Sequence, residues 1–192
     1  VKDPRLAMSH ISANFYNNPS NNMNVVGVTG TNGKTSITHI LYHILQASGR
    51  PCGTLGTLGF QTPSGMRSTG FTTPESVEVQ QMLQTLKMAE VDNVIMEISS
   101  HALELHRVDD VDVDIAVFTN LTPEHMDFHK NMETYSRSKL KLFKALSVKK
   151  TAVVNLDDPY GKKIAQDISA KVITYGLDKR AKLHPVEYKL DL

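Results

Sequence analysis

The chain has 192 residues, 40% of them hydrophobic, and a formal net charge of +1, which suits about one α/β domain with a sizeable core. Its basic residues form no positive stripe of the kind that binds a nucleic-acid backbone, and no apolar run approaches the ~20 residues that cross a bilayer. Its single cysteine, Cys52, can form no disulfide within the chain. These features predict a cytoplasmic protein without nucleic-acid or membrane partners.

Short apolar runs alternate with helical stretches along most of the chain. Residues 1–22 end in a polar, asparagine-rich run and are predicted to be a linker. Strands are expected at residues 24–29, 52–58, 93–98, 114–119, 151–155 and 171–175. Helices are expected at 74–89, with Thr73 as the N-cap, and at 132–146, whereas 60–71 is expected to be a hairpin or mobile loop. The alternation predicts an α/β fold with a mostly parallel sheet flanked by helices.

Residues 25–36 join a β-branched strand to a glycine-rich turn and a helix, as in nucleotide phosphate-binding loops. Gly30 and Gly33 permit positive φ, so backbone N–H groups can converge on an anion at the start of the helix. Lys34 is predicted to reach the β and γ phosphates, and Thr35 to offer a hydroxyl to Mg²⁺. The helix is expected to bury Ile37, Ile40, Leu41, Ile44 and Leu45. The glycine spacing is irregular, and an ordinary glycine turn is the alternative interpretation.

Glu97 ends the apolar strand predicted at 93–98 and is followed at once by Ser99, Ser100 and His101. A buried strand rarely carries a glutamate without a partner. A Mg²⁺ ion would provide one, because hard cations prefer carboxylate oxygens and a phosphate site needs a cation. A salt bridge between Glu97 and a basic side chain is the alternative.

Residues 118–129 place His125 and His129 at helical spacing, together with Glu124 and Asp127. This spacing would suit a metal site. A zinc enzyme usually supplies a third strong ligand nearby, so zinc remains the lesser alternative, and one histidine is expected to join the Mg²⁺ site.

The phosphate loop, residues 29–35, and the segments 97–103, 120–129 and 135–139 together resemble the central ATP-binding domain of the Mur ligases. Within that family they are most similar to the member that adds the third residue of the peptidoglycan peptide stem. The resemblance covers nearly the whole chain to about Tyr175. It implies that residues 1–22 end an N-terminal domain and lead through a linker into an incomplete central domain at 23–192, and that the family's C-terminal domain is absent.

The resemblance also implies a role for individual residues. The ATP site would comprise Gly30, Thr31, Asn32, Gly33, Lys34, Thr35, Ser36 and Asn155. Two Mg²⁺ ions would be held by Thr35, Glu97, His125 and a carbamate formed from CO₂ on Lys139, and the catalytic residues would be Lys34, Glu97, His125 and Lys139. The UDP-N-acetylmuramoyl-dipeptide would contact Thr72, Thr73, Ser99 and Arg107. Two positions depart from the family pattern: Glu124 replaces an aspartate, and Leu105 a glutamine.

The implied activity is ATP-dependent amide-bond formation, in which L-lysine or meso-diaminopimelate is added to UDP-N-acetylmuramoyl-L-alanyl-D-glutamate through an acyl phosphate. We expect a monomer, and residues 1–192 are expected to be inactive alone. Two other classes remain open: a different P-loop phosphoryl-transfer enzyme such as a kinase, and a non-catalytic nucleotide-binding fragment.

Overall fold

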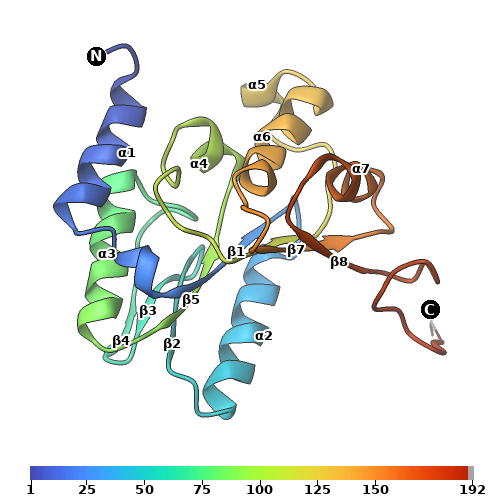
Figure 1. The fold of residues 1–192 in the computed structure, drawn as a ribbon, viewed down its shortest axis with the longest axis horizontal. Helices are drawn as coiled ribbons and strands as arrows, with labels where there is room; N and C mark the ends of the chain where they lie inside the picture. The colour runs from blue at the N-terminus through green and yellow to red at the C-terminus, as the bar shows by residue number, and fades with distance from the viewer. Residues whose placement is uncertain (190–192) are drawn as a thin grey trace.

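The computed structural model describes residues 1–189, which form an eight-stranded sheet with helices on both faces (Figure 1). The strands are β1 (Asn24–Thr29), β2 (Cys52–Gly56), β3 (Gly59–Thr62), β4 (Gly65–Arg67), β5 (Asn93–Glu97), β6 (Ile115–Phe118), β7 (Thr151–Asn155) and β8 (Lys171–Tyr175). Their spatial order is β4-β3-β2-β5-β1-β6-β7-β8. The six strands from β2 to β8 in this order pair in parallel, and the β3–β4 hairpin adds an antiparallel edge. The predicted fold class is confirmed.

The helices are α1 (Pro4–Phe15), α2 (Lys34–Ala47), α3 (Ser76–Met88), α4 (Ser100–Glu104), α5 (Met126–His129), α6 (Met132–Lys144) and α7 (Pro159–Asp167), with a short 3-10 helix η1 (Pro19–Asn22). The larger core cluster joins the sheet to side chains of α3, α4, α6 and α7. A smaller cluster joins the other face of β1, β2 and β5 to α2. Alternate residues of β1 therefore enter opposite layers, as expected for a strand buried on both faces.

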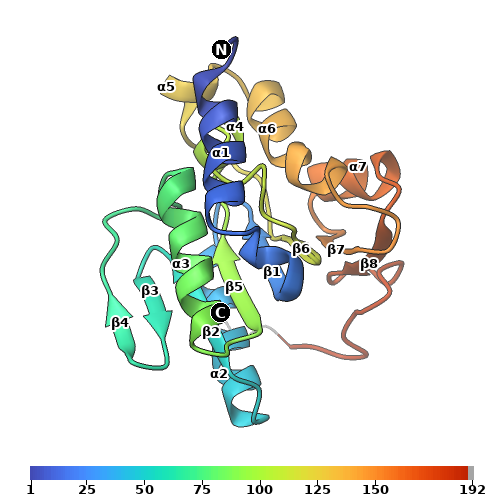
Figure 2. The same ribbon diagram turned by 60° about the vertical axis from the view of Figure 1, so that its left-hand side comes forward.

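The predicted linker at 1–22 is wrong as local structure, because most of it is helical. Asp3 caps α1 by accepting from the backbone N–H groups of Arg5 and Leu6, and proline occupies the first turn. The helix lies beside α3 (Figure 2). The domain boundary at 22/23 remains a prediction, and the last part of the proposed domain 23–192 falls on residues 190–192, outside the described residues.

Several predicted boundaries shift by a few residues. Helix α3 begins at Ser76 with Glu75 as its N-cap, so the predicted N-cap Thr73 is wrong. β2 ends at Gly56 rather than at residue 58, because the chain turns there into the hairpin. The predicted burial of Ile40 and Ile44 is also wrong: each is 59% exposed, because only one stripe of α2 contacts the sheet.

The central strands bring the chemically interesting segments to one edge of the sheet. β1 lies between β5 and β6, with Val28 opposite Glu97 and Thr29 opposite Phe118. The loops after these strands therefore meet at the carboxyl edge, where ligands bind in open parallel sheets. Across residues 1–189, the structure contains no helix of the length and hydropathy needed to cross a membrane.

Candidate active site

The phosphate loop has the backbone conformation that the sequence predicts. Gly30 and Gly33 have φ values of 148° and 87°, and α2 begins directly afterwards at Lys34. A Cβ atom at Gly30 would overlap the Thr119 hydroxyl, so this position excludes a side chain as well as favouring glycine. The loop thus places backbone N–H groups at the positive end of a 14-residue helix.

The segment after β6 holds the phosphate loop in place. The backbone N–H groups of Thr31 and Asn32 donate to the Asn120 carbonyl and side-chain oxygens at 2.9 and 3.0 Å. The Thr119 hydroxyl donates to the Asn32 carbonyl at 2.6 Å. These contacts fix the loop before any nucleotide arrives. Thr119 and Asn120 were not predicted as site residues, although their position just after a central strand was a signal for them.

Two lysine side chains converge on the carbonyl oxygen of Gly30. Lys34 Nζ donates to the Gly30 and Thr31 carbonyls at 2.9 and 2.8 Å, and Lys139 Nζ donates to the Gly30 carbonyl at 2.9 Å. Burial lowers the pKa of Lys34, while Glu124 and Glu97 act in the opposite direction. The structure therefore joins the predicted phosphate lysine to a second lysine 105 positions later in the sequence.

Lys139 is 2% exposed and lies on the face of α6 that also buries Tyr135, Leu142 and Phe143. Burial, with the nearby Lys34 charge, lowers its pKa to about 7. A lysine of ordinary pKa would be almost wholly protonated at neutral pH, whereas this one has a substantial neutral fraction. The neutral amine is the form that reacts with CO₂, so the environment of Lys139 fits carbamate formation.

Glu97 is 1% exposed at the end of β5. Its carboxylate accepts from the Thr35 hydroxyl at 2.9 Å, and from the backbone N–H and the hydroxyl of Thr57 at 2.8 and 3.2 Å. No salt bridge to Glu97 occurs among residues 1–189, so the salt-bridge alternative is wrong for that part of the chain. A buried carboxylate held only by neutral donors, beside a hydroxyl that can also bind a cation, fits Mg²⁺.

A cavity of about 450 Å³ opens between the phosphate loop and Glu97. It is lined by Thr31, Asn32, Gly33, Lys34, Thr35, Ser36, Thr57, Thr72, Glu97, Glu124 and His125. The structure thus brings three of the four predicted metal ligands to one cavity, while the Lys139 amine meets the loop at Gly30. Thr57 was missed by the sequence analysis, and its position directly after β2 was the available signal.

The two histidines of segment 118–129 face different surroundings. His125 precedes α5 in a left-handed conformation, with its side chain 46% exposed and Nε2 3.6 Å from Glu124. His129 is buried, and its Nε2 lies 2.8 Å from the Ser100 hydroxyl. Within residues 1–189 no three His, Cys, Asp or Glu side chains form a metal-ligating group, so the zinc alternative has no support.

The predicted acceptor residues form a connected surface. Thr73 donates to the Glu97 carbonyl at 2.8 Å and accepts from the Ser99 N–H at 3.1 Å, while the Thr72 and Thr57 hydroxyls lie 3.0 Å apart. The Ser99 hydroxyl caps α4. Arg107 donates to the Thr73 carbonyl at 3.0 Å and to Glu75 at 2.6 Å. A substrate carboxylate at Arg107 would therefore compete with Glu75.

Asn155, predicted to approach the nucleotide, is tied to the phosphate loop through Thr119. Its side chain donates to the Thr119 carbonyl at 2.8 Å, and its oxygen accepts from the Asp157 N–H at 3.0 Å. It also lines an open cavity with Tyr175 and Gly176. Asn155 is thus adjacent to the loop, outside the cavity that contains Lys34.

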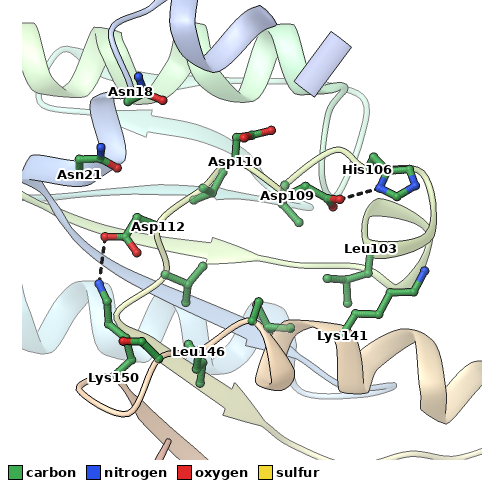
Figure 3. A pocket seen from close by; sticks show the side chains of 16 residues that line it. Asn18, Asn21, Leu103, His106, Asp109, Asp110, Asp112, Lys141, Leu146 and Lys150 are labelled. Carbon is green, nitrogen blue, oxygen red and sulfur yellow. Dashed lines mark hydrogen bonds and ion pairs between the residues drawn. The ribbon is translucent and has the colours of Figure 1, made fainter. Parts of the chain in front are cut away.

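A second cavity, of about 580 Å³, lies between η1, the loop before β6 and the end of α6 (Figure 3). Its charged groups are paired with one another or with neighbours: Lys150 with Asp112, His106 with Asp109, and Lys141 with Glu104. It contains no predicted site residue. Although this cavity has the larger volume, the candidate active site is the smaller cavity, which Lys34, Thr35 and Glu97 line.

Gly56 offers a test of the Glu97 site. A Cβ atom there would overlap Oε1 of Glu97, so Gly56→Ala is expected to displace the carboxylate. The factor by which Mg²⁺ strengthens ADP binding is then expected to fall by about 10-fold. Gly53→Ala is the matched control, because its Cβ would meet Leu86 in the core and cost stability only. Calorimetric titration with and without Mg²⁺, alongside urea unfolding, separates the two effects. Equal Mg²⁺ dependence in both variants would contradict this prediction.

Comparison with known proteins agrees with this geometry. Residues 28–191 match the family model described as the Mur ligase middle domain. The UDP-N-acetylmuramoyl-L-alanyl-D-glutamate–2,6-diaminopimelate ligase of Caldanaerobacter subterraneus subsp. tengcongensis is 44% identical over 192 residues, which cover 100% of this chain and 39% of that protein. The ligase of the same name from Geobacter metallireducens is 44% identical over 183 residues, covering 92% and 36%.

A solved structure of a ligase with that name has a similar fold. It superposes with a TM-score of 0.72 at 32% identity, covering 82% of this chain and 33% of that one. The chain thus spans only part of the length of these proteins: 39% of the first curated relative and 33% of the solved structure. The family model covers most of the chain and includes the whole phosphate loop and the segments at the carboxyl edge. The chain belongs to the Mur ligase family, of which it carries the middle domain.

Proposed function

We propose that this chain is the ATP-binding part of a ligase that joins 2,6-diaminopimelate to UDP-N-acetylmuramoyl-L-alanyl-D-glutamate. The observation that carries the proposal is the cavity in which Lys34, Thr35 and Glu97 meet at the end of the phosphate loop. The names of the relatives favour diaminopimelate over L-lysine as the incoming amino acid. The enzyme would act as a cytoplasmic monomer.

In the proposed reaction a carboxylate of the acceptor attacks the γ-phosphorus of ATP, ADP leaves, and an acyl phosphate forms. The amine then attacks the acyl carbon and phosphate departs, leaving an amide. Lys34 would leave the Gly30 and Thr31 carbonyls to bind the transferring phosphoryl group, assisted by the N–H groups of the loop. Arg107 would orient the acceptor by its bidentate fork.

Thr35, Glu97, His125 and carbamylated Lys139 would hold two Mg²⁺ ions in this proposal. When bound, such ions neutralise the charge of the phosphates and stabilise the attacking and leaving oxygens of phosphoryl transfer. The residues themselves would position the nucleotide. No protein nucleophile is required, which agrees with the absence of a Ser-His-Asp arrangement in the sequence.

The test is phosphate release by the full-length protein with Mg-ATP and the UDP-muramoyl-dipeptide, with meso-diaminopimelate or L-lysine added separately. Release that depends on diaminopimelate supports the proposal, and release that depends on L-lysine supports the ligase with the other amino acid. If ATP turns over equally without either amino acid, a phosphoryl-transfer enzyme such as a kinase is the better assignment. If nucleotide binds without turnover under any condition, the chain is a nucleotide-binding fragment.

A further inference from the structure

One buried polar side chain beside the phosphate loop has no part in the proposed function: that of Tyr135. It lies in α6 and is 1% exposed. Its hydroxyl is 3.2 Å from Oγ1 of Thr31, the residue after Gly30 in the loop. Burial of a tyrosine is ordinary, but its hydroxyl then needs a partner, and here that partner belongs to the nucleotide site.

The hydrogen bonds around Thr31 determine the direction of this contact. Thr31 Oγ1 donates to the Thr122 carbonyl at 3.2 Å and accepts from the Thr122 N–H at 3.0 Å. A hydroxyl has one proton and two lone pairs, so only one lone pair remains. Both of the 3.2 Å contacts of this hydroxyl are hydrogen bonds at once only when the Tyr135 hydroxyl donates to that lone pair, which completes the bonding of Thr31.

The ring of Tyr135 contacts two further parts of the site. Lys139, one turn later in α6, places Nζ 4.6 Å from the ring centroid while donating to the Gly30 carbonyl. His129 lies against the ring with a centroid distance of 4.7 Å, and its Nε2 reaches the Ser100 hydroxyl. α6 thus contacts two consecutive loop residues, Gly30 through Lys139 and Thr31 through Tyr135.

We propose that Tyr135 is a positioning residue that fixes the phosphate loop to α6 and thereby raises the affinity for nucleotide. It acts through Thr31, because its hydroxyl holds the loop in its binding conformation before the nucleotide arrives. This inference rests on the proposed function, since it requires the loop to bind a nucleotide. The role belongs to the hydroxyl, whereas the ring supports packing.

The test is a double-mutant cycle on the full-length protein with Mg-ADP as the probe, measured by calorimetric titration. Tyr135→Phe is expected to weaken Mg-ADP binding by about three- to ten-fold, the range for one hydrogen bond, while the ring stays in place. In a Thr31→Val background the same substitution is expected to cause no further loss, because the acceptor is already missing. Additive losses, or an unchanged affinity in Tyr135→Phe, would overturn the proposal.

Tyr42→Phe is the matched control. Its hydroxyl accepts from Gln46 Nε2 at 3.1 Å on α2, so the substitution also removes one phenol hydrogen bond, two turns into the helix from Lys34. Tyr135→Phe is expected to lose more stability in urea, because its hydrogen bond is buried and that of Tyr42 is exposed, and only Tyr135→Phe is expected to lose affinity. Equal affinity losses in both would mean that the effect is merely structural. If wild-type protein fails to bind Mg-ADP, the proposed function itself is overturned. If wild type binds Mg-ADP and Tyr135→Phe binds it equally well, only the role of Tyr135 is overturned.

Discussion

Lys34→Met is expected to lower acceptor-dependent phosphate release by the full-length protein by about 10³-fold. The side chain keeps most of its length but loses the only charge that α2 places at the mouth of the loop, where charge accumulates during phosphoryl transfer. Because part of this interaction forms only in the transition state, kcat is expected to fall more than KM for ATP rises. Coupled phosphate detection over a range of ATP concentrations measures both parameters.

Lys144→Met is the control for Lys34→Met. Lys144 is the last residue of α6 and is exposed, so Lys144→Met changes the net charge by the same amount as Lys34→Met without affecting the phosphate loop. Its kcat is expected to stay within about two-fold of wild type, as for most surface substitutions. A Lys34→Met enzyme that retained a tenth of wild-type kcat would contradict the assignment of Lys34 to the transferring phosphoryl group.

Lys139→Ala is expected to reduce the same activity by about 10³-fold and to be partly rescued by added short carboxylic acids. The rescue follows because a small carboxylate can occupy the space of the missing side chain and supply the oxygen ligands of a carbamate. Lys141→Ala is the control, since Lys141 lies on the same helix but pairs with Glu104 at the surface. Loss of activity without rescue by any carboxylic acid would contradict the carbamate role.

Lys139 also has a measurable effect on stability. Its pKa is about 7 in the folded state and 10.5 when unfolded, so between these values the unfolded chain binds more protons and stability rises with pH. In CO₂-free buffer, the free energy of unfolding of wild type relative to Lys139→Met is therefore expected to increase by on the order of 2 kcal/mol from pH 6 to pH 9. Urea unfolding at several pH values measures it, and a difference independent of pH would contradict the shifted pKa.

Local sequence patterns predicted the framework of the site well. The strands at 24–29, 151–155 and 171–175 have the expected bounds, and Gly30 and Gly33 have the positive φ that their positions require. These features follow from side-chain period and from the conformational freedom of single residues, both of which act over a few positions. The helix at 4–15 was missed because the asparagine-rich run that follows it, at residues 17–22, obscured a capped start at Asp3.

The sequence by itself thus determined the alternation of strands and helices, the phosphate loop and the placement of Glu97 at the end of a strand. Only the tertiary structure decided which side chains share the site. Thr57 reaches Glu97 across 40 positions, and Lys139 reaches Gly30 across 109. Helical period places Lys139 on the buried stripe of α6 with Tyr135 and Leu142, and Lys141 off it. Only the packing of α6 on the loop decides that the Lys139 amine leaves water and meets the Gly30 carbonyl. Burial of that kind sets pKa and partners, and it depends on the whole fold.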